Sequence, residues 1–376
     1  MSALEVSAVE SALSRVEDPE IGRPLTELGM VKSIDITGND VHVALYLTIA
    51  GCPMKSTIES NARAALEEID GVGNVSLEMD VMSDDQRREL RKQLRGGQDE
   101  PEIPFAKPDS TTRVFAVASG KGGVGKSSMT VNLAAALQAK GLKVGIVDAD
   151  IYGHSVPGLL GSTAGPTVVD DMLMPPISHG IKHISIGQFV EGNAPVVWRG
   201  PMLHRALQQF LGDVFWGDLD ILLLDLPPGT GDVALSVAQL LPNAELLVVT
   251  TPQAAAAEVA ERAGSLSIQT RQRITGVIEN MSAMVMPDGS VMDIFGSGGG
   301  EVVAERLSTL TGAQVPLLGQ IPLDPQLRVQ GDDGTPVVLS APDSPASQAV
   351  MAIADQLAVR KDSLAGKSLG LGVTRT

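Results

Sequence analysis

The pattern of apolar and polar positions changes once along this chain of 376 residues, near residue 112. Before that point, apolar and polar residues alternate with a period of two at residues 31–36 and 41–47, which is typical of strands buried on one face. The Thr-Gly-Asn-Asp turn between them predicts a hairpin. From residue 113 the strands are instead continuous apolar runs separated by helical stretches, which indicates a parallel sheet covered on both faces.

The first predicted domain, residues 1–94, is a small α+β domain. It adds helices at residues 4–16 and 53–69, and a third strand at residues 72–81, to the hairpin.

The segments that flank the domains are polar. Residues 83–95 are highly charged, and this pattern predicts the solvated end of a helix. Residues 95–112 are rich in glycine and proline, as expected for a tether between domains, although Ile103 and Phe105 within it are expected to dock on the domain that follows. The tail at residues 361–376 is rich in Gly, Ser and Lys and is predicted to be disordered.

The second predicted domain, residues 113–360, alternates strand and helix, which is typical of a doubly wound parallel α/β sheet. An apolar strand at residues 114–118 leads into a glycine-rich loop and then into a run at residues 129–140 that reads as an amphipathic helix. The further strands are expected to begin at residues 143, 220, 245, 274 and 316.

The glycine-rich loop carries the motif G-x-x-x-x-G-K-[ST]. Its glycines allow backbone N–H groups to close around phosphates, and the N-terminus of the next helix favours negative charge. In such a loop Lys126 reaches the β- and γ-phosphates and the Ser127 hydroxyl binds Mg²⁺, so the motif predicts an ATP site. A single site of this kind needs no second lysine, which leaves Lys121 unexplained. The residues expected to contact the nucleotide here are Gly120, Lys121, Gly122, Gly123, Val124, Gly125, Lys126, Ser127 and Ser128.

Polar residues end three predicted strands at the edge where ligands bind in such sheets. Asp148 and Asp150 follow one apolar run and, on a continuing strand, point to opposite faces, so we expect them to have different roles, with Asp148 among the residues that bind the nucleotide. Four apolar residues lead to Asp225 in the Walker B pattern, and its carboxylate is expected to hold Mg²⁺ through water. The Gly229 N–H is placed to sense a γ-phosphate. Asn280 is expected to offer its amide to a base edge.

Two features stand out in the first domain. One is the acidic sequence Asp18-Pro19-Glu20, and the other is Cys52, the one cysteine of the chain, at a junction between strand and helix. A thiol at a helix N-terminus has a lowered pKa, which favours a nucleophile or a metal ligand. The alternatives are a buried apolar cysteine and an acidic turn that caps a helix.

The composition limits the kinds of partner that the protein is expected to bind. The net charge of −17 opposes binding to nucleic acid or to an anionic membrane, which both need a basic surface. No apolar run approaches the ~18 residues of a membrane span, and the N-terminus lacks the pattern of a secretory signal. A single cysteine fits a reducing compartment. We therefore expect a cytoplasmic protein that binds neither nucleic acid nor membrane.

The glycine loop with its two lysines, the pair Asp148 and Asp150, the sequence Asp225-x-Pro-Pro-Gly and Asn280 together resemble the deviant Walker A ATPases. That group includes MinD, ParA, the nitrogenase iron protein and Mrp. The resemblance covers most of residues 113–357 and implies that ATP and Mg²⁺ are bound.

Further segments resemble the Mrp type, including Trp-Arg-Gly-Pro-Met-Leu from residue 198 and Ile-Pro-Leu-Asp-Pro from residue 321. This resemblance implies a homodimeric ATPase that carries iron–sulfur clusters. It also implies that Lys121 reaches across the dimer to the partner's nucleotide, that Lys126 is catalytic, and that Asp150 orients the attacking water.

The first domain resembles a small domain linked to iron–sulfur assembly, over about residues 3–82. This resemblance implies that Cys52 handles an iron–sulfur cluster and that the partners are iron–sulfur apoproteins and an assembly scaffold. One departure concerns the second domain, where many relatives carry Cys-Pro-x-Cys after Asn-Met-Ser. Met286 and Gly289 occupy the two cysteine positions here. Thiolates are the usual cluster ligands, and a dimer of this chain supplies only its two copies of Cys52.

The resemblance leaves three alternatives to a cluster carrier. An ATP-dependent maturation chaperone without its own cluster is compatible with the missing cysteines. A positioning ATPase like MinD or ParA needs an amphipathic C-terminal helix or a basic face, and neither is present in the sequence. An electron-transfer reductase needs paired bridging cysteines in the second domain.

Overall fold

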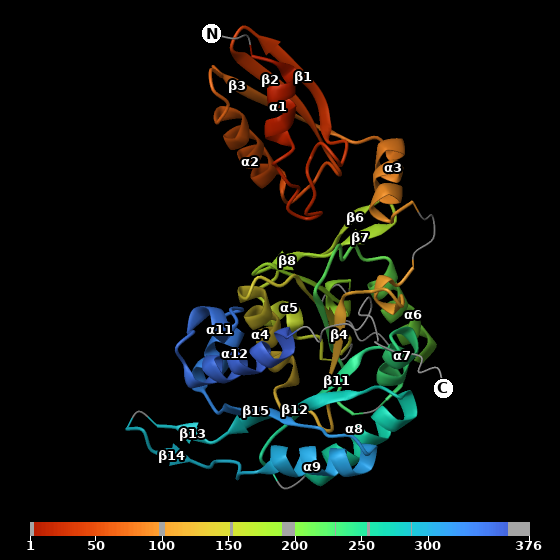
Figure 1. Ribbon diagram of the computed structural model, residues 1–376, viewed down its shortest axis with the longest axis vertical. Coiled ribbons are helices and arrows are strands. Elements are labelled where there is room, and N and C mark those ends of the chain that lie inside the picture. The colour runs from red at the N-terminus through yellow and green to blue at the C-terminus, as the bar shows by residue number, and fades with distance from the viewer. Residues whose placement is uncertain are drawn as a thin grey trace, which may run out of the picture.

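The computed structural model describes residues 4–97, 102–150, 153–189, 200–229, 231–253, 256–286 and 288–359. A small domain lies at one end of an elongated molecule and a larger α/β domain at the other (Figure 1). The predicted fold class, a small α+β domain followed along the chain by an α/β domain with a parallel sheet, is therefore confirmed. The tail at residues 361–376 lies outside the described residues, and the predicted domain limits stay predictions.

The small domain is a three-stranded sheet with two helices. Strand β2 pairs antiparallel with β1, which confirms the hairpin, and parallel with β3, so α2 is the crossover between them. Its core is aliphatic, with Val43, Leu45, Ile58 and Leu66 fully buried. The elements are α1 (Val6–Leu13), β1 (Val31–Thr37), β2 (Asp40–Leu47), α2 (Lys55–Glu67) and β3 (Val75–Val81).

The larger domain is built on an eight-stranded sheet in the order β15-β12-β11-β4-β10-β5-β9-β8, parallel except for the edge strand β8. The chain runs from β4 to β5 on one side and later reaches β11 on the other. The switch in direction therefore lies beside β4, where ligands bind in such sheets. The strands are β4 (Arg113–Ser119), β5 (Val144–Asp148), β8 (Ile177–Ser178), β9 (Ile181–Ser185), β10 (Ile221–Asp225), β11 (Glu245–Thr250), β12 (Ile274–Ser282) and β15 (Leu317–Pro322).

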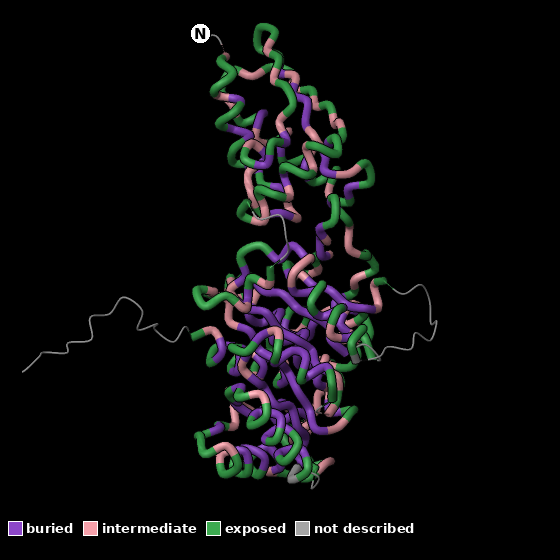
Figure 2. Tube along the Cα trace, turned by 90° about the vertical axis from the view of Figure 1, so that its right-hand side faces the viewer, coloured by how far each residue is buried: buried purple, intermediate pink, exposed green. Residues whose placement is uncertain are grey.

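Helices cover both faces of this sheet, and the strands between them form the buried centre of the domain (Figure 2). One face packs against α6 to α9, and the other against α4, α5, α11 and α12. The helices are α4 (Lys126–Ala139), α5 (Val156–Leu159), α6 (Gly200–Gly212), α7 (Asp232–Leu240), α8 (Ala256–Thr270), α9 (Gly299–Thr311), α10 (Pro325–Asp332), α11 (Val337–Ser340) and α12 (Pro345–Ala358).

Helix α4 differs from its prediction. We expected an amphipathic helix, but residues 129–137 are all buried. The reason is that α4 packs against the sheet on one side and against α11 and α12 on the other, so it has no broad solvent face.

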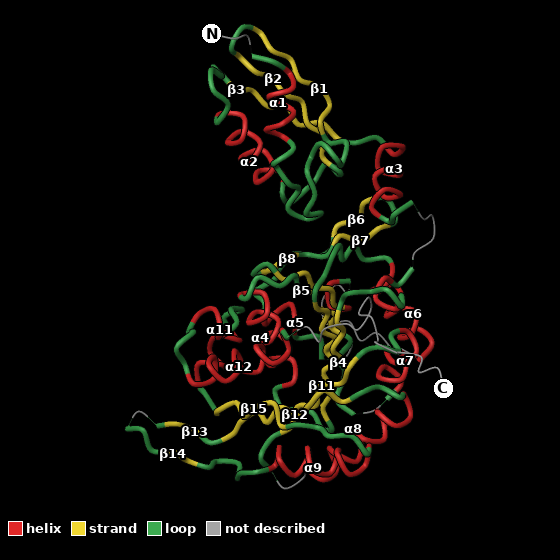
Figure 3. The backbone as a smooth tube through the Cα atoms, viewed as in Figure 1, coloured by secondary structure: helices red, strands yellow, loops and turns green. Residues whose placement is uncertain are grey.

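The charged segment after β3 forms α3 (Asp84–Leu94), which Ser83 caps through a capping box. It lies beside a hairpin of the larger domain, β6 (Thr167–Val169) and β7 (Met172–Met174), as Figure 3 shows. Leu90 of α3 is buried in the same apolar cluster as Met172. The predicted solvated helix end is therefore wrong for this face of α3.

Ion pairs reinforce the contact between α3 and the hairpin. The Arg91 guanidinium lies 3.1 Å from the carboxylate of Asp170 and 2.6 Å from that of Asp171, and Arg95 lies 3.7 Å from Asp171. These pairs and the apolar cluster join the two domains in the described structure.

Short elements complete the fold. In the tether, η1 (Pro104–Ala106) buries the Phe105 ring edge-on against Trp216, with ring centroids 6.3 Å apart. Another 3-10 turn, η2 (Ile186–Gln188), follows β9. The hairpin of β13 (Met284–Val285) and β14 (Val291–Met292) extends away from the sheet (Figure 1).

Candidate functional site

The glycine loop joins β4 to α4 at the carboxyl edge of the sheet. Gly123 and Gly125 have φ angles of 77° and 79°, which side chains rarely adopt. A Cβ on Gly125 would lie 2.3 Å from Nδ2 of Asn280, and one on Gly120 would lie 2.6 Å from Cα of Val259. The loop therefore needs glycine both for its backbone angles and for its close packing.

A buried polar cluster lies at the start of α4. Nζ of Lys126 is 2.7 Å from Oδ1 of Asp225, and these side chains are 6% and 0% exposed. The hydroxyls of Ser127 and Thr130 donate to the same carboxylate, at 2.5 Å and 2.8 Å. The structure thus brings together the predicted phosphate-binding lysine and the two predicted Mg²⁺ ligands, Ser127 and Asp225. Hydroxyl and carboxylate oxygens are the ligands that Mg²⁺ prefers.

Asp148 ends β5 and is fully buried beside this cluster. Its Oδ2 accepts hydrogen bonds from the Ser185 hydroxyl at 3.0 Å and from the Val156 N–H at 3.3 Å. Burial, followed by the negative charge of Asp225, raises the pKa of Asp148 to about 8. Asp148 is therefore protonated at neutral pH.

Asp150 lies just beyond the end of β5 and is 9% exposed. Its N–H donates to Oδ1 of Asp148 at 3.2 Å, and its own Oδ1 accepts the Gly153 N–H at 3.1 Å. The strand ends at Asp148, so the alternation of a continuing strand does not apply to Asp150.

Asn280, on β12, is buried against the glycine loop. Its Nδ2 donates to the Val124 carbonyl at 2.9 Å. Its Oδ1 is buried and has no hydrogen-bond partner. An unpaired buried acceptor is costly, and a donor group on a ligand would satisfy it. This orphaned acceptor beside a phosphate loop fits a bound nucleotide.

Two further predicted groups make contacts within the chain. The Lys121 ammonium donates to the side-chain oxygen of Gln253, which follows β11. The Gly229 N–H donates to the Ser119 carbonyl at 2.9 Å, so it is engaged with the end of β4.

Cys52 lies three residues before the start of α2 and is 8% exposed. Burial raises the pKa of its thiol, and the charges of Glu20 and Asp18 raise it further, while the N–H groups of Met54 and Lys55 act in the opposite direction. The expectation of a lowered pKa is therefore wrong, because burial outweighs the helix N-terminus. The structure nevertheless brings Cys52 into the field of the Asp18-Pro19-Glu20 sequence.

No group of three or more His, Cys, Asp or Glu side chains in the described ranges is arranged to hold a metal ion. The hairpin that contains Met286 and Gly289 exposes apolar side chains instead, with Val291 65% and Met292 51% exposed.

Sequence reasoning missed two residues of this site. Thr130 lies one helical turn after Lys126, so the spacing of the motif signals that both face the same carboxylate. Ser185 lies 37 residues after Asp148 on a separate strand, and nothing in the local sequence marks it.

Comparison with known proteins gives consistent matches to both domains. The family model described as NUBPL iron-transfer P-loop NTPase matches residues 110–358. The model described as iron-sulfur cluster assembly protein matches residues 7–77.

Curated relatives match over almost the whole chain. The iron-sulfur cluster carrier protein of Mycobacterium tuberculosis H37Rv is 66% identical over 98% of this chain and 97% of its own length. The protein of the same name from Deinococcus radiodurans is 44% identical over 93% of this chain and 94% of its own length.

Among solved structures, a nucleotide-binding protein from Archaeoglobus fulgidus in complex with ADP matches with a TM-score of 0.51 and 38% identity. The match covers 59% of this chain and 86% of that one. No helix in the described residues has the length and apolar character needed to span a membrane.

Proposed function

Because this chain belongs to the iron–sulfur cluster carrier proteins with a ParA-type P-loop NTPase domain, we propose that it hydrolyses ATP and uses hydrolysis to deliver clusters to apoproteins. The observation that supports this proposal is the contact of Lys126 and Ser127 with the buried carboxylate of Asp225, beside the glycine loop. In a nucleotide complex, Lys126 exchanges Asp225 for phosphate oxygens.

The remaining residues assist this reaction. Mg²⁺ held by Ser127 and Asp225 would neutralise charge that develops on the phosphates. Asp150 orients the attacking water, and its position just beyond the carboxyl end of β5 supports that role. Asn280 fixes the nucleotide through its free Oδ1.

We further propose that two copies of the chain meet around ATP, with Lys121 of each reaching the nucleotide of the other. The contact between Lys121 and Gln253 supports this proposal, because it joins exposed side chains and costs little to exchange.

The first test is the hydrolysis rate of Lys126→Ala. We expect a loss of at least about 100-fold, because a positioned charge on the transferred phosphate is removed. Lys140→Ala, just beyond the other end of α4, is the matched control and should keep the wild-type rate. Retained hydrolysis in Lys126→Ala would contradict the assignment of the phosphate loop.

The dimer has a separate test. Lys121→Ala should leave binding of ADP to the monomer unchanged while it lowers the hydrolysis rate by at least about tenfold. A rate equal to that of the wild type would reject the role of Lys121 across the dimer.

Cys52 is the proposed cluster ligand of the chain. A dimer brings two such thiolates, fewer than the four of an ordinary cluster, so the other ligands come from outside the chain. Anaerobic reconstitution of wild type and Cys52→Ala, with iron and sulfide counted per dimer, tests this. Iron uptake by the wild type alone is the expected result.

An ATP-dependent chaperone without its own cluster is the second candidate. The observation that favours it is the lack of a second cysteine in the chain, with Met286 and Gly289 at the positions of the Cys-Pro-x-Cys segment of many Mrp-type proteins. If neither protein takes up iron in the reconstitution experiment, this second function is supported and direct carriage is wrong.

A further inference from the structure

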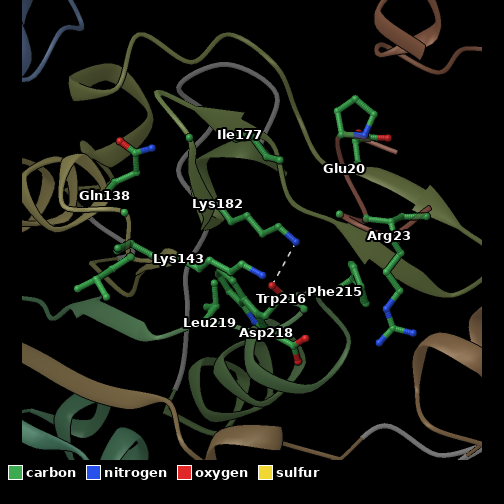
Figure 4. Close-up of a pocket in the computed structure, with 18 residues that line it drawn as sticks. Glu20, Arg23, Gln138, Lys143, Ile177, Lys182, Phe215, Trp216, Asp218 and Leu219 are labelled. Atoms are coloured by element: carbon green, nitrogen blue, oxygen red, sulfur yellow. Dashed lines mark hydrogen bonds between the residues drawn. The ribbon is translucent and has the colours of Figure 1, made fainter. Parts of the chain in front are cut away.

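A cavity of about 290 Å³ lies where the two domains meet (Figure 4). The first domain contributes residues 19–23, which follow Asp18. The second contributes residues 141–144 at the start of β5, Ile177 and Lys182 from β8 and β9, and residues 215–219. We call this space the seam cavity. It lies at the amino ends of β5 and β9, whereas the glycine loop lies at the carboxyl edge of the sheet.

Three basic side chains from separate segments line the seam cavity: Arg23, Lys143 and Lys182. Within the described part of the chain, none of the three forms an ion pair. This grouping is unexpected in a protein with a net charge of −17, where carboxylates are abundant. The ammonium groups of Lys143 and Lys182 point toward the same space, whereas the Arg23 side chain points away from them (Figure 4). Two lysine ammonium groups that face one cavity indicate a negatively charged ligand.

Lys182 is held in position by its surroundings. Its Nζ donates to the Trp216 carbonyl at 3.1 Å and lies 4.8 Å from the centre of the Phe215 ring. An ammonium group has three donors, so donors remain after the bond to Trp216. Burial, and then the charge of Lys143, lowers the pKa of Lys182 to about 8.

Acidic groups also face Lys182, and they do not cancel the positive charge. Glu20 and Asp218 line the seam cavity, and Asp18 lies behind it. Burial, together with the charge of Asp18, raises the pKa of Glu20 to about 7. Asp18 accepts the backbone N–H groups of residues 20 and 21. At neutral pH the lining therefore keeps an excess of positive charge.

The rest of the lining is apolar and aromatic, with Ile177, Leu219, Phe215 and Trp216 beside the lysines. This combination suits a ligand with an acidic group at one end and a small apolar body. We propose that the seam cavity binds a small organic anion, whose carboxylate or phosphate groups are held by Lys143 and Lys182. A ligand in this place contacts both domains and strengthens their association.

Calorimetric titration tests this proposal. The full chain is first saturated with Mg-ADP, which fills the phosphate loop, and is then titrated with tricarballylate or with phenyl phosphate. We expect at least one anion to bind, and the tighter one identifies carboxylate or phosphate as the preferred group. Absence of binding by both anions would overturn the proposal.

Variants locate the binding. Lys143 is exposed, so Lys143→Ala should fold normally and weaken binding several-fold. Adding Lys182→Ala should weaken it at least tenfold, and Lys92→Ala, an exposed lysine on α3, should change nothing. Equal affinity for wild type and both pocket variants would place the anion elsewhere and reject the seam cavity.

A second measurement does not depend on the variants. An anion beside Lys182 favours its charged form, so binding near pH 8 should take up protons, and the measured heat should vary with the ionisation enthalpy of the buffer. A heat that is the same in all buffers at pH 8 would contradict contact with Lys182. Neither readout uses ATP hydrolysis, so the proposal can fail while the proposed function stands.

Discussion

At the scale of single residues, two fully buried carboxylates on neighbouring strands have different partners. Asp225 has the Lys126 ammonium and two hydroxyls around it. Asp148 receives hydrogen bonds from the Ser185 hydroxyl and from backbone N–H groups but has no cation in contact. Burial, and then the charge of Asp225, therefore outweigh the hydrogen bonds and the charge of Lys126, and they raise the pKa of Asp148 to about 8.

This difference predicts the pH dependence of stability. The pKa of Asp148 rises from 3.8 to about 8 on folding. At a pH between these two values, the native state therefore holds a proton that the unfolded chain has released. Its contribution to stability is present at low pH and is lost as the pH rises toward 8. In urea unfolding, the free energy of unfolding of the wild type should fall between pH 5 and pH 8. We expect this fall to be smaller by about 2–4 kcal/mol in Asp148→Asn. Parallel pH profiles for the two proteins would show that Asp148 is ionised when folded.

Sequence was a good guide to residues that belong to motifs. Lys126 and Asp225 are far apart in the chain, yet each is marked by its own local pattern, and the structure joins them. Ser185 has no such mark, because its role depends on which strand lies beside β5. The raised pKa of Cys52 could not be predicted from the sequence either, because it results from burial by the surrounding domain rather than from the adjacent helix.

At the scale of elements, the glycine loop is fixed by β12 as well as by its own turn. Asn280 holds the Val124 carbonyl, and its side chain fills the space beside Gly125. Gly123 has a similar φ angle but has open space beside it. Alanine at Gly123 would therefore add backbone strain alone, whereas alanine at Gly125 would add backbone strain and steric overlap.

We expect Gly123→Ala to lower the free energy of unfolding by about 1 kcal/mol, which is the cost of a left-handed angle. Gly125→Ala should lower it by about 3 kcal/mol or more, because the added Cβ also overlaps Asn280. Chemical denaturation without nucleotide measures both.

The double variant Gly125→Ala/Asn280→Ala should recover part of the loss, because the obstructing amide is gone. Strictly additive losses in this cycle would show that overlap with Asn280 is not the cause.

Predictions of elements succeeded where packing on two sides leaves long apolar runs, as in β10 and β11. Helix α4 was also predicted, but its amphipathic character was wrong, because α11 and α12, which cover it, come from the far end of the chain. The hairpin of β6 and β7 has three residues in each strand, too few for any period to be read.

At the scale of the whole molecule, one apolar cluster crosses the boundary between the domains. It combines the core of the first domain with Val169, Met172, Met174 and Phe215 of the second. The first domain is therefore anchored by the hairpin of β6 and β7 rather than carried loosely on its tether.

A charge in this cluster should uncouple the domains. We expect Met172→Asp, at a residue 2% exposed, to split thermal unfolding into two transitions and to destabilise the first domain by about 3 kcal/mol. Val168→Asp, on the same hairpin but 51% exposed, should stay within about 0.5 kcal/mol of wild type. Calorimetry with a single unchanged transition in Met172→Asp would show that the cluster does not couple them.

The solitary buried thiol gives this protein a built-in reporter. Since Cys52 is the only cysteine in 376 residues, thiol alkylation of the cluster-free protein reports on the exposure of this one site in the first domain. Its shielding and raised pKa both keep the labelling rate low in the native state. The rate at which a maleimide reacts, followed with and without ATP, therefore measures whether nucleotide turnover in one domain loosens the other.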